Sequence, residues 1–589
     1  MNIFGVLFMR KIISMLLVFV LSIGLMAGCG GSNDSSSNNG DNSYSDNSVG
    51  FSTNDVKYIE DGASVYRIIR PENGEMDEGQ IAGFVFKQMK DILGVSVKNT
   101  DDTNDGTDVY EILVGNTNRP ESKQALDYLK SQCGGRYNDY IICTIGKKIV
   151  INAYNADFLK KACEYFTSNF LKKEGVSGGI SYLEKTVGDF ENYTVNGTNV
   201  SDFKFVRQRL NSSYLSTLEI NKLVDTIYQK SGYKLSLVFD TYVAETDCEI
   251  IVGNANRTGV STITDYDTYE IKISGNKIYL NGGSPHATAM AVSEFHKIIA
   301  TKNTLTDADS LTGSYQTALA NYDRKTTYAP TWFDTFDGAG IDTTKWRVVG
   351  GTEFGRDGQN GKWSGMSDDP NFVFQSDGQF FVYGQENGTQ YLGGTIKNDK
   401  TMRFHYGYVE YSGISPNGPS FWSLLWFCGS GGYSKYLSPE IDLNECFGNG
   451  KVTAANCHAW PTTAGKEIGK EHTSLDGEYS KQKQYWCPDG KTWADDFHTY
   501  GFLWDEDEMT FVGDGDVFFS YQTNTNEDDI DAFVNSWMYM QFSFSVGRAN
   551  NGEQASELTA EHWQNSSKFV VDWVYLYQFD DGKQGLTLL

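Results

Sequence analysis

The chain has 589 residues, and its 76 Asp and Glu against 49 Lys and Arg give a net charge of −27. Such an acidic chain is poorly suited to bind nucleic acid or anionic lipid, so we expect no nucleic-acid partner. Aromatic residues make up 14% of the chain and Gly occurs 61 times, a composition that favours β-structure with many turns. The length is enough for about three or four domains.

The N-terminus is typical of an export signal. Two basic residues precede an uncharged, mostly apolar segment at residues 12–28, and Cys29 follows directly. A short apolar segment that ends in small residues predicts a signal peptide over residues 1–28 rather than a membrane span. The ending Leu-Met-Ala-Gly-Cys resembles a bacterial lipoprotein box, although Met26 stands where Leu is usual. The resemblance implies lipidation of Cys29 and a location on the outer face of the cell membrane. A plain secretory signal or an uncleaved anchor stays open.

Residues 29–53 are rich in Ser, Asn, Asp and Gly and lack the apolar residues that a core needs. We therefore expect a disordered tether between the membrane anchor and the folded part. Eight further Cys follow along the chain. In an exported protein they can form disulfides or remain as buried thiols, and their spacing does not decide between the two.

An internal repeat marks the next part of the chain. Residues 111–119 (EILVGNTNR) recur at residues 249–257 as EIIVGNANR. In both copies a helical pattern precedes the motif, and a hairpin and a second helix follow it. The pattern predicts two repeated α+β domains, residues 54–186 and 187–315. Their role is not indicated: Arg119 and Arg257 either contact a ligand or belong to plain polar turns.

The segments that carry this pattern follow one another in the same order in each copy. The predicted helices lie near residues 81–92, 156–171, 215–227 and 285–300, and the hairpins lie at 140–153 and 269–282, with turns at Gly146-Lys147 and Gly275-Asn276.

From about Thr327 onward the helical periodicity is lost. Short alternating segments separated by Gly, Asn and Asp take its place, at residues 372–375, 379–384, 406–412, 499–504, 509–513, 538–545 and 569–577. Regular short strands over about 260 residues predict an antiparallel β-sandwich of the jelly-roll type over residues 327–582. The chain is therefore predicted to be a multidomain protein, with two α+β domains before an all-β domain.

Three carboxylates lie within six residues, in the segment Glu440-Ile-Asp-Leu-Asn-Glu445. A glycosidase needs two carboxyl groups, one to protonate the leaving group and one to capture the sugar cation. Side chains alternate along a strand, so Glu440 and Asp442 share a face and Glu445 is on the other. A β-bulge, which adds one residue, would return Glu445 to the shared face. The pattern alone is weak, since roughly one match is expected by chance in so acidic a chain.

Five further blocks surround this segment. They lie at residues 332–346, 406–410, 420–426, 497–504 and 571–577. In sequence and in order, these blocks resemble glycoside hydrolase family 16, the laminarinase and lichenase group, over residues 331–580. The resemblance implies a concanavalin A-like jelly roll. It also places residues 440–445 on the catalytic strand, in the bulged version of the family.

The resemblance implies a role for each carboxylate. Glu440 is the nucleophile, Glu445 is the general acid/base with a raised pKa, and Asp442 keeps its two neighbours in different protonation states. The implied activity is endo-hydrolysis of β-1,3 or mixed β-1,3-1,4 glucan with retention of configuration. Two alternatives stay open: the same fold acting on a galactan such as agar or carrageenan, and a non-catalytic surface glycan-binding protein.

Other positions match the family less specifically. Trp422 and Trp426 match tryptophans of the substrate cleft, with Trp422 favoured as the sugar platform and Trp426 favoured as a core residue. His458 and Trp460 follow the catalytic strand and are candidates to line the cleft.

A structural calcium ion is also implied by the resemblance. Asp572 matches a metal-binding position on the convex face, and oxygen atoms near Asp334 and Gly378 would complete the site. No cofactor is required for the chemistry, and we expect a monomer.

Overall fold

The computed structural model describes residues 50–74, 76–315, 329–430, 435–448, 450–474, 484–525, 527–547, 554–578 and 584–589. The predicted signal peptide, Cys29 and most of the tether lie outside these residues. The chain divides into two compact units. The first comprises residues 1–129 and 140–184, and the second comprises residues 130–139 and 185–589. Among the helices that the structure describes, none has both the length and the apolar character needed to span a membrane.

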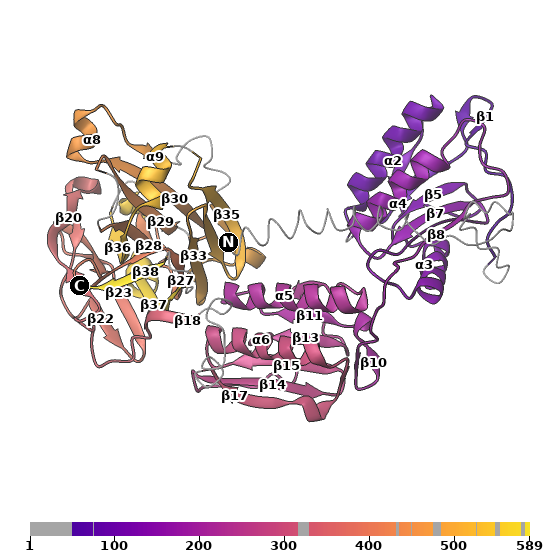
Figure 1. Cartoon of the computed structure of the whole chain (residues 1–589). Helices are drawn as coiled ribbons and strands as arrows, with labels where there is room; N and C mark the ends of the chain where they lie inside the picture. Colours follow the sequence, from indigo (N-terminus) through magenta and orange to yellow (C-terminus); the bar gives the residue numbers. More distant parts are fainter. Residues whose placement is uncertain are drawn as a thin grey trace, which may run out of the picture. The chain divides into compact units, whose positions relative to one another are not determined.

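The first unit is built on a six-stranded sheet with the order β4-β3-β5-β7-β6-β8. Strands β3, β4, β5 and β7 are parallel, and β6 returns antiparallel to β7. Figure 1 shows α2 and α4 together on one face of the sheet and α3 on the other. The element bounds are β3 Arg67–Arg70, α2 Glu78–Leu93, β4 Asn99–Asp101, β5 Glu111–Val114, α3 Pro120–Cys133, β6 Tyr140–Ile145, β7 Lys148–Ala153, α4 Ala156–Asn169 and β8 Ser181–Glu184, with a small hairpin formed by β1 Ile59–Glu60 and β2 Ala63–Ser64.

The second unit begins with a sheet of the same kind, in the order β12-β11-β13-β15-β14-β17. Its helices α5 and α6 bury their apolar faces against one side of the sheet. The bounds are β11 Lys204–Arg207, α5 Tyr214–Ser231, β12 Leu237–Phe239, β13 Glu249–Val252, β14 Thr268–Ser274, β15 Lys277–Gly282, α6 Pro285–Thr301 and β17 Leu311–Ser314; the short strands β9 Thr194–Val195, β10 Thr198–Asn199 and β16 Thr304–Leu305 form a separate small sheet.

The two α+β sheets share their strand order and their hairpin turns. Ile145 pairs with Lys148 across the first turn, and Ser274 pairs with Lys277 across the second, so each loop has the two predicted residues. Helix α3 was not anticipated from the sequence. That the two regions are copies of one duplicated domain, with boundaries at residues 186 and 315, stays a prediction.

The arginines of the repeated motif have a structural role in both sheets. The Nε atom of Arg119 donates to Glu111 at 3.0 Å, and Arg257 makes the same bond to Glu249 at 3.0 Å. All four side chains are buried. A buried charge is tolerated when it is paired and hydrogen bonded, so these residues tie a strand to the loop that follows it. The geometry supports the plain-turn interpretation of this motif rather than ligand binding.

The rest of the second unit is a two-layer β-sandwich, as predicted. One layer is an eight-stranded sheet with the order β22-β23-β37-β27-β33-β34-β35, and β18 pairs with β37. Its bounds are β18 Ala329–Asp334, β22 Val373–Ser376, β23 Gln379–Tyr383, β27 Gly407–Ile414, β33 His498–Trp504, β34 Glu508–Gly513, β35 Asp516–Gln522 and β37 Lys568–Gln578.

The other layer is a thirteen-stranded sheet whose main path is β20-β21-β25-β36-β28-β29-β30-β31. An aromatic-rich core fills the space between the layers. The bounds are β19 Arg347–Val349, β20 Gly351–Asp357, β21 Trp363–Met366, β24 Gln385–Glu386, β25 Gln390–Lys397, β26 Met402–His405, β28 Phe421–Gly429, β29 Leu437–Phe447, β30 Val452–Pro461, β31 Thr473–Ser474, β32 Gln484–Trp486, β36 Met538–Val546 and β38 Gly585–Leu588, with the short helices α8 Thr463–Glu467 and α9 Glu527–Asp529.

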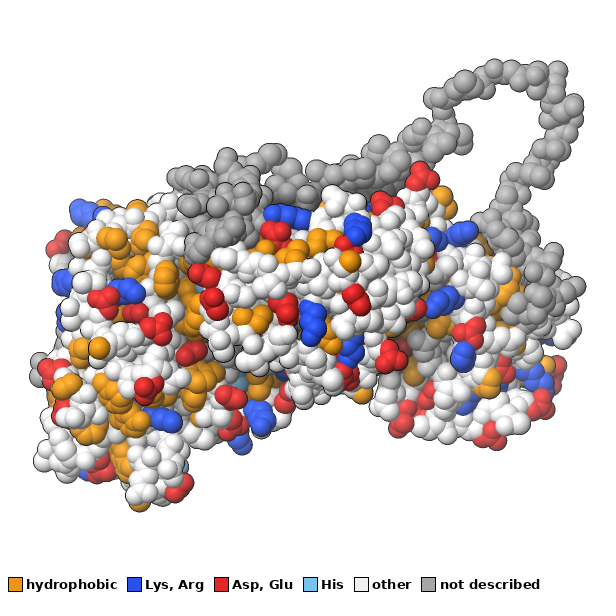
Figure 2. All heavy atoms as spheres, turned by 90° about the horizontal axis from the view of Figure 1, so that it is seen from below, with side chains coloured by type: hydrophobic (Ala, Val, Ile, Leu, Met, Phe, Trp, Pro, Cys, Tyr) orange, Lys and Arg blue, Asp and Glu red, His pale blue; other side chains and the backbone are white. Residues whose placement is uncertain are grey.

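On the face that Figure 2 shows, charged side chains are not gathered by sign. In the view of Figure 2, acidic and basic side chains are interspersed among uncharged ones on the described part of this face. The excess negative charge therefore does not form one continuous acidic patch there.

Within the second unit, helix α5 begins against the eight-stranded sheet. Glu410 of β27 is fully buried and accepts hydrogen bonds from the Ser213 hydroxyl at 2.7 Å and from the Tyr214 amide at 3.0 Å. The carboxyl group thus caps the first turn of the helix from a neighbouring element by accepting hydrogen bonds there. Asp516 of β35 forms further ion pairs with Arg207 and Arg209.

A β-bulge interrupts strand β29 in the thirteen-stranded sheet. Asp442 pairs with Asn456 and Glu445 pairs with Ala454, so three steps along β29 correspond to two along β30. The buried Asn444 holds the extra residue in place: its carbonyl accepts from the Leu425 amide at 2.9 Å, and its amide donates to the Tyr411 hydroxyl at 2.6 Å. The expected bulge is present, and its backbone is fixed by hydrogen bonds inside the core.

Glu410 makes the stability of the second unit depend on pH. Burial raises the pKa of this carboxyl from 4.5 to about 7 in the folded protein. Because the folded state holds the proton more tightly, the stability from this group is complete below pH 4.5 and is lost as the pH rises through 7. Glu410→Gln should flatten this fall, measured as hydrogen exchange at the first turn of α5 across the range. Glu508→Gln on the same sheet is the control, and an unaltered pH slope in Glu410→Gln contradicts the assignment.

Loss of the Asn444 side chain should destabilise the bulge. Asn444→Ala leaves the Leu425 amide and the Tyr411 hydroxyl without this partner in the core, at a cost of about 1–3 kcal/mol for each. Denaturant unfolding should therefore show reduced stability. Asn565→Ala, at an exposed asparagine, provides the control. Equal stability of the two variants would show that Asn444 does not hold the bulge.

Candidate active site

The three predicted carboxylates lie on one face of β29. Glu440 and Asp442 alternate with the core residues Ile441 and Leu443, and the bulge returns Glu445 to the face of the first two. We call this side of the thirteen-stranded sheet, which faces away from the core, the open face. Glu440 and Glu445 are half-buried there, and Asp442 is buried. The geometry therefore brings together the three residues that the sequence predicts.

His458 connects the carboxylates to the next strand. It lies opposite Glu440 on β30, and its Nε2 atom is 3.2 Å from an oxygen of Asp442. Its other ring nitrogen, Nδ1, is 3.0 Å from Nε2 of His472. His458 therefore belongs to the site, where it bridges a carboxylate and a second imidazole.

The environment of Glu440 sets its protonation. Burial raises the pKa of Glu440, while the charge of His458 and a hydrogen bond from Trp460 act in the opposite direction. Burial disfavours the charged form of a carboxyl, and nearby positive charge favours it. His458 and Trp460 thus promote the ionised carboxylate that a nucleophile needs.

Aromatic side chains border the carboxylates on both neighbouring strands. Trp426 of β28 lies opposite Asp442, and its indole nitrogen donates to Ser543 at 2.8 Å. Trp422 stacks on Phe447 with ring centroids 5.5 Å apart. Both tryptophans are half-buried on the open face. Trp426, which was expected in the core, is therefore placed on the same face as Trp422.

A second aromatic group lies on the far side of Glu440. Trp460 is 42% exposed and stacks on His472 with ring centroids 3.7 Å apart. Sequence reasoning identified Trp460 and missed His472, which lies in the segment after β30 and carries no motif. It also missed Cys428, the neighbour of Glu440 across β28.

One group of three potential metal ligands occurs among the described residues. Atoms of Glu440, Asp442 and His458 lie within 4.8 Å of one another. Two of its three members, Glu440 and Asp442, are among the carboxylates that a glycosidase mechanism would use, whereas Glu445 is outside the group. The group therefore fits the predicted carboxylate site without requiring a metal.

The residues predicted for calcium lie on the other sheet. Asp334 accepts hydrogen bonds from the Trp346 indole at 2.8 Å and from the Phe336 amide at 3.0 Å. Asp572 is partly buried, which raises its pKa, and the charge of Asp337 adds to the rise. Asp337, which the sequence did not single out, also lies beside Gly378. Calcium binding stays a prediction.

The arrangement provides two carboxyl groups on one strand face, a third between them and aromatic surfaces on either side. Such a set can protonate a glycosidic oxygen, attack the anomeric carbon and hold sugar rings by stacking.

The region that contains these residues also matches a known protein family. Residues 366–575 match the model of Glycosyl hydrolases family 16. The chain is 25% identical over 209 residues to "Glucan endo-1,3-beta-glucosidase A1" of Niallia circulans, covering 32% of this chain and 28% of that protein. It is 23% identical over 199 residues to "Endo-1,3-1,4-beta-glycanase ExsH" of Rhizobium meliloti, covering 34% and 36%. The chain thus spans about a third of the length of these curated relatives.

Among solved structures, the laminarinase from Flavobacterium sp. UMI-01 is 20% identical, with a TM-score of 0.33, covering 42% of this chain and 100% of that one. The family match includes β29, which carries the three carboxylates, and its neighbours β28 and β30. Residues 366–575 of this chain are therefore similar to glycoside hydrolases of family 16.

Proposed function

We propose that this protein is a retaining endo-glycosidase that hydrolyses β-1,3 or mixed β-1,3-1,4 glucan. The observation that carries the proposal is the bulge in β29, which sets Glu440, Asp442 and Glu445 on one face within the region matched to the family. Two carboxyl groups that flank one bond are what double displacement requires.

In the first step, the Glu440 carboxylate attacks the anomeric carbon while Glu445 donates its proton to the departing glycosidic oxygen. The bond to that oxygen breaks, and an ester forms between the sugar and Glu440. In the second step, Glu445 takes a proton from water, the water oxygen attacks the same carbon, and Glu440 leaves as a carboxylate. Two inversions give net retention. Asp442, which is 3.2 Å from His458, adds a charge between the two glutamates and so helps to hold them in different protonation states.

The proposed substrate rests on the relatives and on the aromatic surfaces. One curated relative is named as a glucan endo-1,3-β-glucosidase and the other as an endo-1,3-1,4-β-glycanase. Trp422, Trp426 and Trp460 offer faces on which neutral sugar rings stack. A galactan is the alternative substrate, since the segments expected to select the polymer, near residues 429–438 and 461–488, lie partly outside the described residues. A purely binding role is disfavoured by the presence of all three carboxylates.

The proposed place of action is the outer face of the cell membrane. The support is the lipoprotein-like sequence that ends at Cys29 and the tether after it. A long flexible tether would let an anchored enzyme reach a polymer beyond the membrane surface.

Replacing the catalytic carboxylates should abolish hydrolysis. Glu440→Gln removes the nucleophile, and release of oligosaccharides from laminarin or lichenan should fall to background. Glu445→Gln should slow release by roughly 10²–10⁴-fold, the usual contribution of a general acid/base. Glu508→Gln, on the opposite sheet, is the matched control and should retain activity. Product sizing on a panel that includes agar and carrageenan identifies the substrate, and undiminished release by Glu440→Gln would falsify the assignment.

The acidic limb of the pH profile should depend on His458. Glu440 must be ionised to attack, so its raised pKa limits activity on the acidic side. Because His458 lowers that pKa, His458→Ala should move the acidic limb of kcat/KM to higher pH. His562→Ala, outside the cluster, is the control for loss of an imidazole. A shift to lower pH, or no shift, would show that His458 does not act on Glu440.

A further inference from the structure

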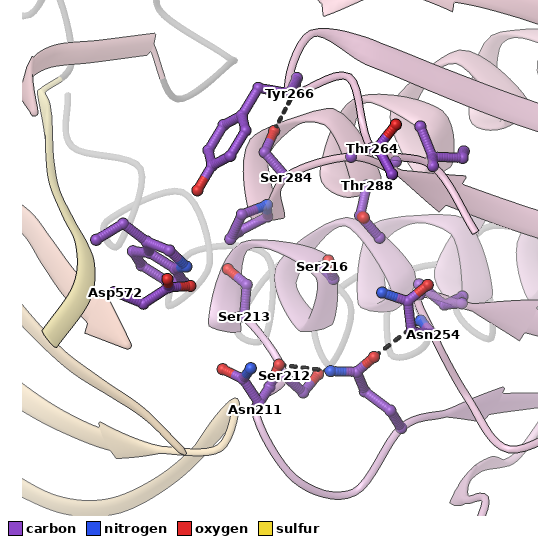
Figure 3. Close-up of a pocket in the computed structure, with 18 residues that line it drawn as sticks. Asn211, Ser212, Ser213, Ser216, Asn254, Thr264, Tyr266, Ser284, Thr288 and Asp572 are labelled. Atoms are coloured by element: carbon purple, nitrogen blue, oxygen red, sulfur yellow. Dashed lines mark hydrogen bonds between the residues drawn. The ribbon is translucent and has the colours of Figure 1, made fainter. Parts of the chain in front are cut away.

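A polar cavity lies within the second unit, away from the carboxylates of β29. Its volume is about 410 Å³. Figure 3 shows the α+β side of the cavity, formed by the loops after β11, β13 and β15 and by the first turns of α5 and α6, with Asp572 of β37 on the opposite side. The catalytic carboxylates belong to the thirteen-stranded sheet, whereas β37 belongs to the eight-stranded one.

The position is one where α/β sheets commonly bind ligands. Strands β11, β13 and β15 are parallel, and their carboxyl ends meet at the cavity. Ligands of open α/β sheets bind at such ends, because the loops there are free to carry polar groups. The helix starts are already capped, since Ser213 accepts from the Leu215 amide and Ser284 from the Ala287 amide.

Two residues with hydroxyl side chains line this cavity, and neither hydroxyl has a partner in the described part of the chain. Ser216 is 4% exposed and Thr288 is 8% exposed, and both line the cavity. Neither side-chain hydroxyl forms a hydrogen bond with another described residue. Each hydroxyl can donate one hydrogen bond and accept others, so both are available to water or to a ligand with hydroxyl groups of its own. Figure 3 shows both side chains on the α5 and α6 side of the cavity.

The charge of the lining selects a neutral ligand. Asp572 is the only charged residue among the lining residues, all of which the structure describes. An anion would meet this carboxylate without a compensating cation, whereas a sugar hydroxyl can donate to it. Tyr266, which is 38% exposed, and Trp573 add aromatic surface. Hydroxyls, amides, one carboxylate and aromatic rings together are what sugar rings bind to.

We propose that this cavity is a non-catalytic binding site for a neutral sugar of one or two rings. The volume lies within the range of small-molecule sites. Either a free oligosaccharide or the end of a polymer chain supplies such a ligand. The site does not depend on the glucanase assignment, because its lining shares no residue with the catalytic carboxylates and their partners.

The test is isothermal titration calorimetry of sugar binding to the full chain. The chain carries Glu440→Gln, so that the probes are not hydrolysed. The probes are laminaribiose, cellobiose and lactose, with inorganic phosphate as the anionic comparison. We expect a binding event for at least one sugar that persists when Trp422→Ala is added, and none for phosphate. Thr288→Val and Ser216→Ala each remove one hydroxyl and should weaken that event by roughly three- to tenfold.

Thr301→Val, at the exposed end of the same helix α6, is the matched control and should leave the event unchanged. Far-ultraviolet circular dichroism checks that each variant is folded. Titrations with EDTA and with calcium separate sugar binding from a metal at Asp572. The proposal is overturned if no sugar binds once Trp422 is replaced, if Thr288→Val and Thr301→Val bind equally, or if phosphate binds in place of sugar. A soaked polymer fragment seen in the cavity by crystallography would identify the chain end as the ligand source.

Discussion

The active site depends on one extra residue in strand β29. Without the bulge, Glu445 would point into the core beside Leu443, and only two carboxylates would reach the open face. Asn444 makes the bulge stable because its side chain satisfies a backbone amide and a tyrosine hydroxyl where no water is available. The arrangement of the three carboxylates is thus set by a buried hydrogen-bonding side chain inside the core.

Hydrogen bonds and ion pairs of buried side chains also connect the parts of the second unit. The carboxyl group of Glu410 caps helix α5, and Asp516 pairs with Arg207 and Arg209. These contacts are specific in direction, unlike the apolar contacts beside them, which involve Leu215, Ala289 and Trp573. Removing one partner of a buried pair is more harmful than the pair is beneficial, so such contacts fix orientation more than they add stability.

The features that the sequence predicts correctly are those that depend on residues close together in the chain. The turns at Gly146 and Gly275, whose φ angles are positive, and the alternating strands of the sandwich follow from residues close in the chain. The bulge was predicted from spacing, with the help of family resemblance. Helix α3 was missed because its sequence is largely polar and has no counterpart in the second sheet. His472 and Asp337 were missed because only tertiary structure brings them to Trp460 and Gly378.

A sandwich presents two faces, and this chain uses them differently. The open face of the thirteen-stranded sheet carries the carboxylates, while part of the eight-stranded sheet is covered by α5 and α6. If covering that sheet were the only role of the α+β region, an apolar contact would suffice. The contact instead borders a polar cavity lined by hydroxyl and amide side chains at the carboxyl ends of parallel strands. These polar groups add nothing to the packing of the two layers, so their presence there is better explained by a ligand.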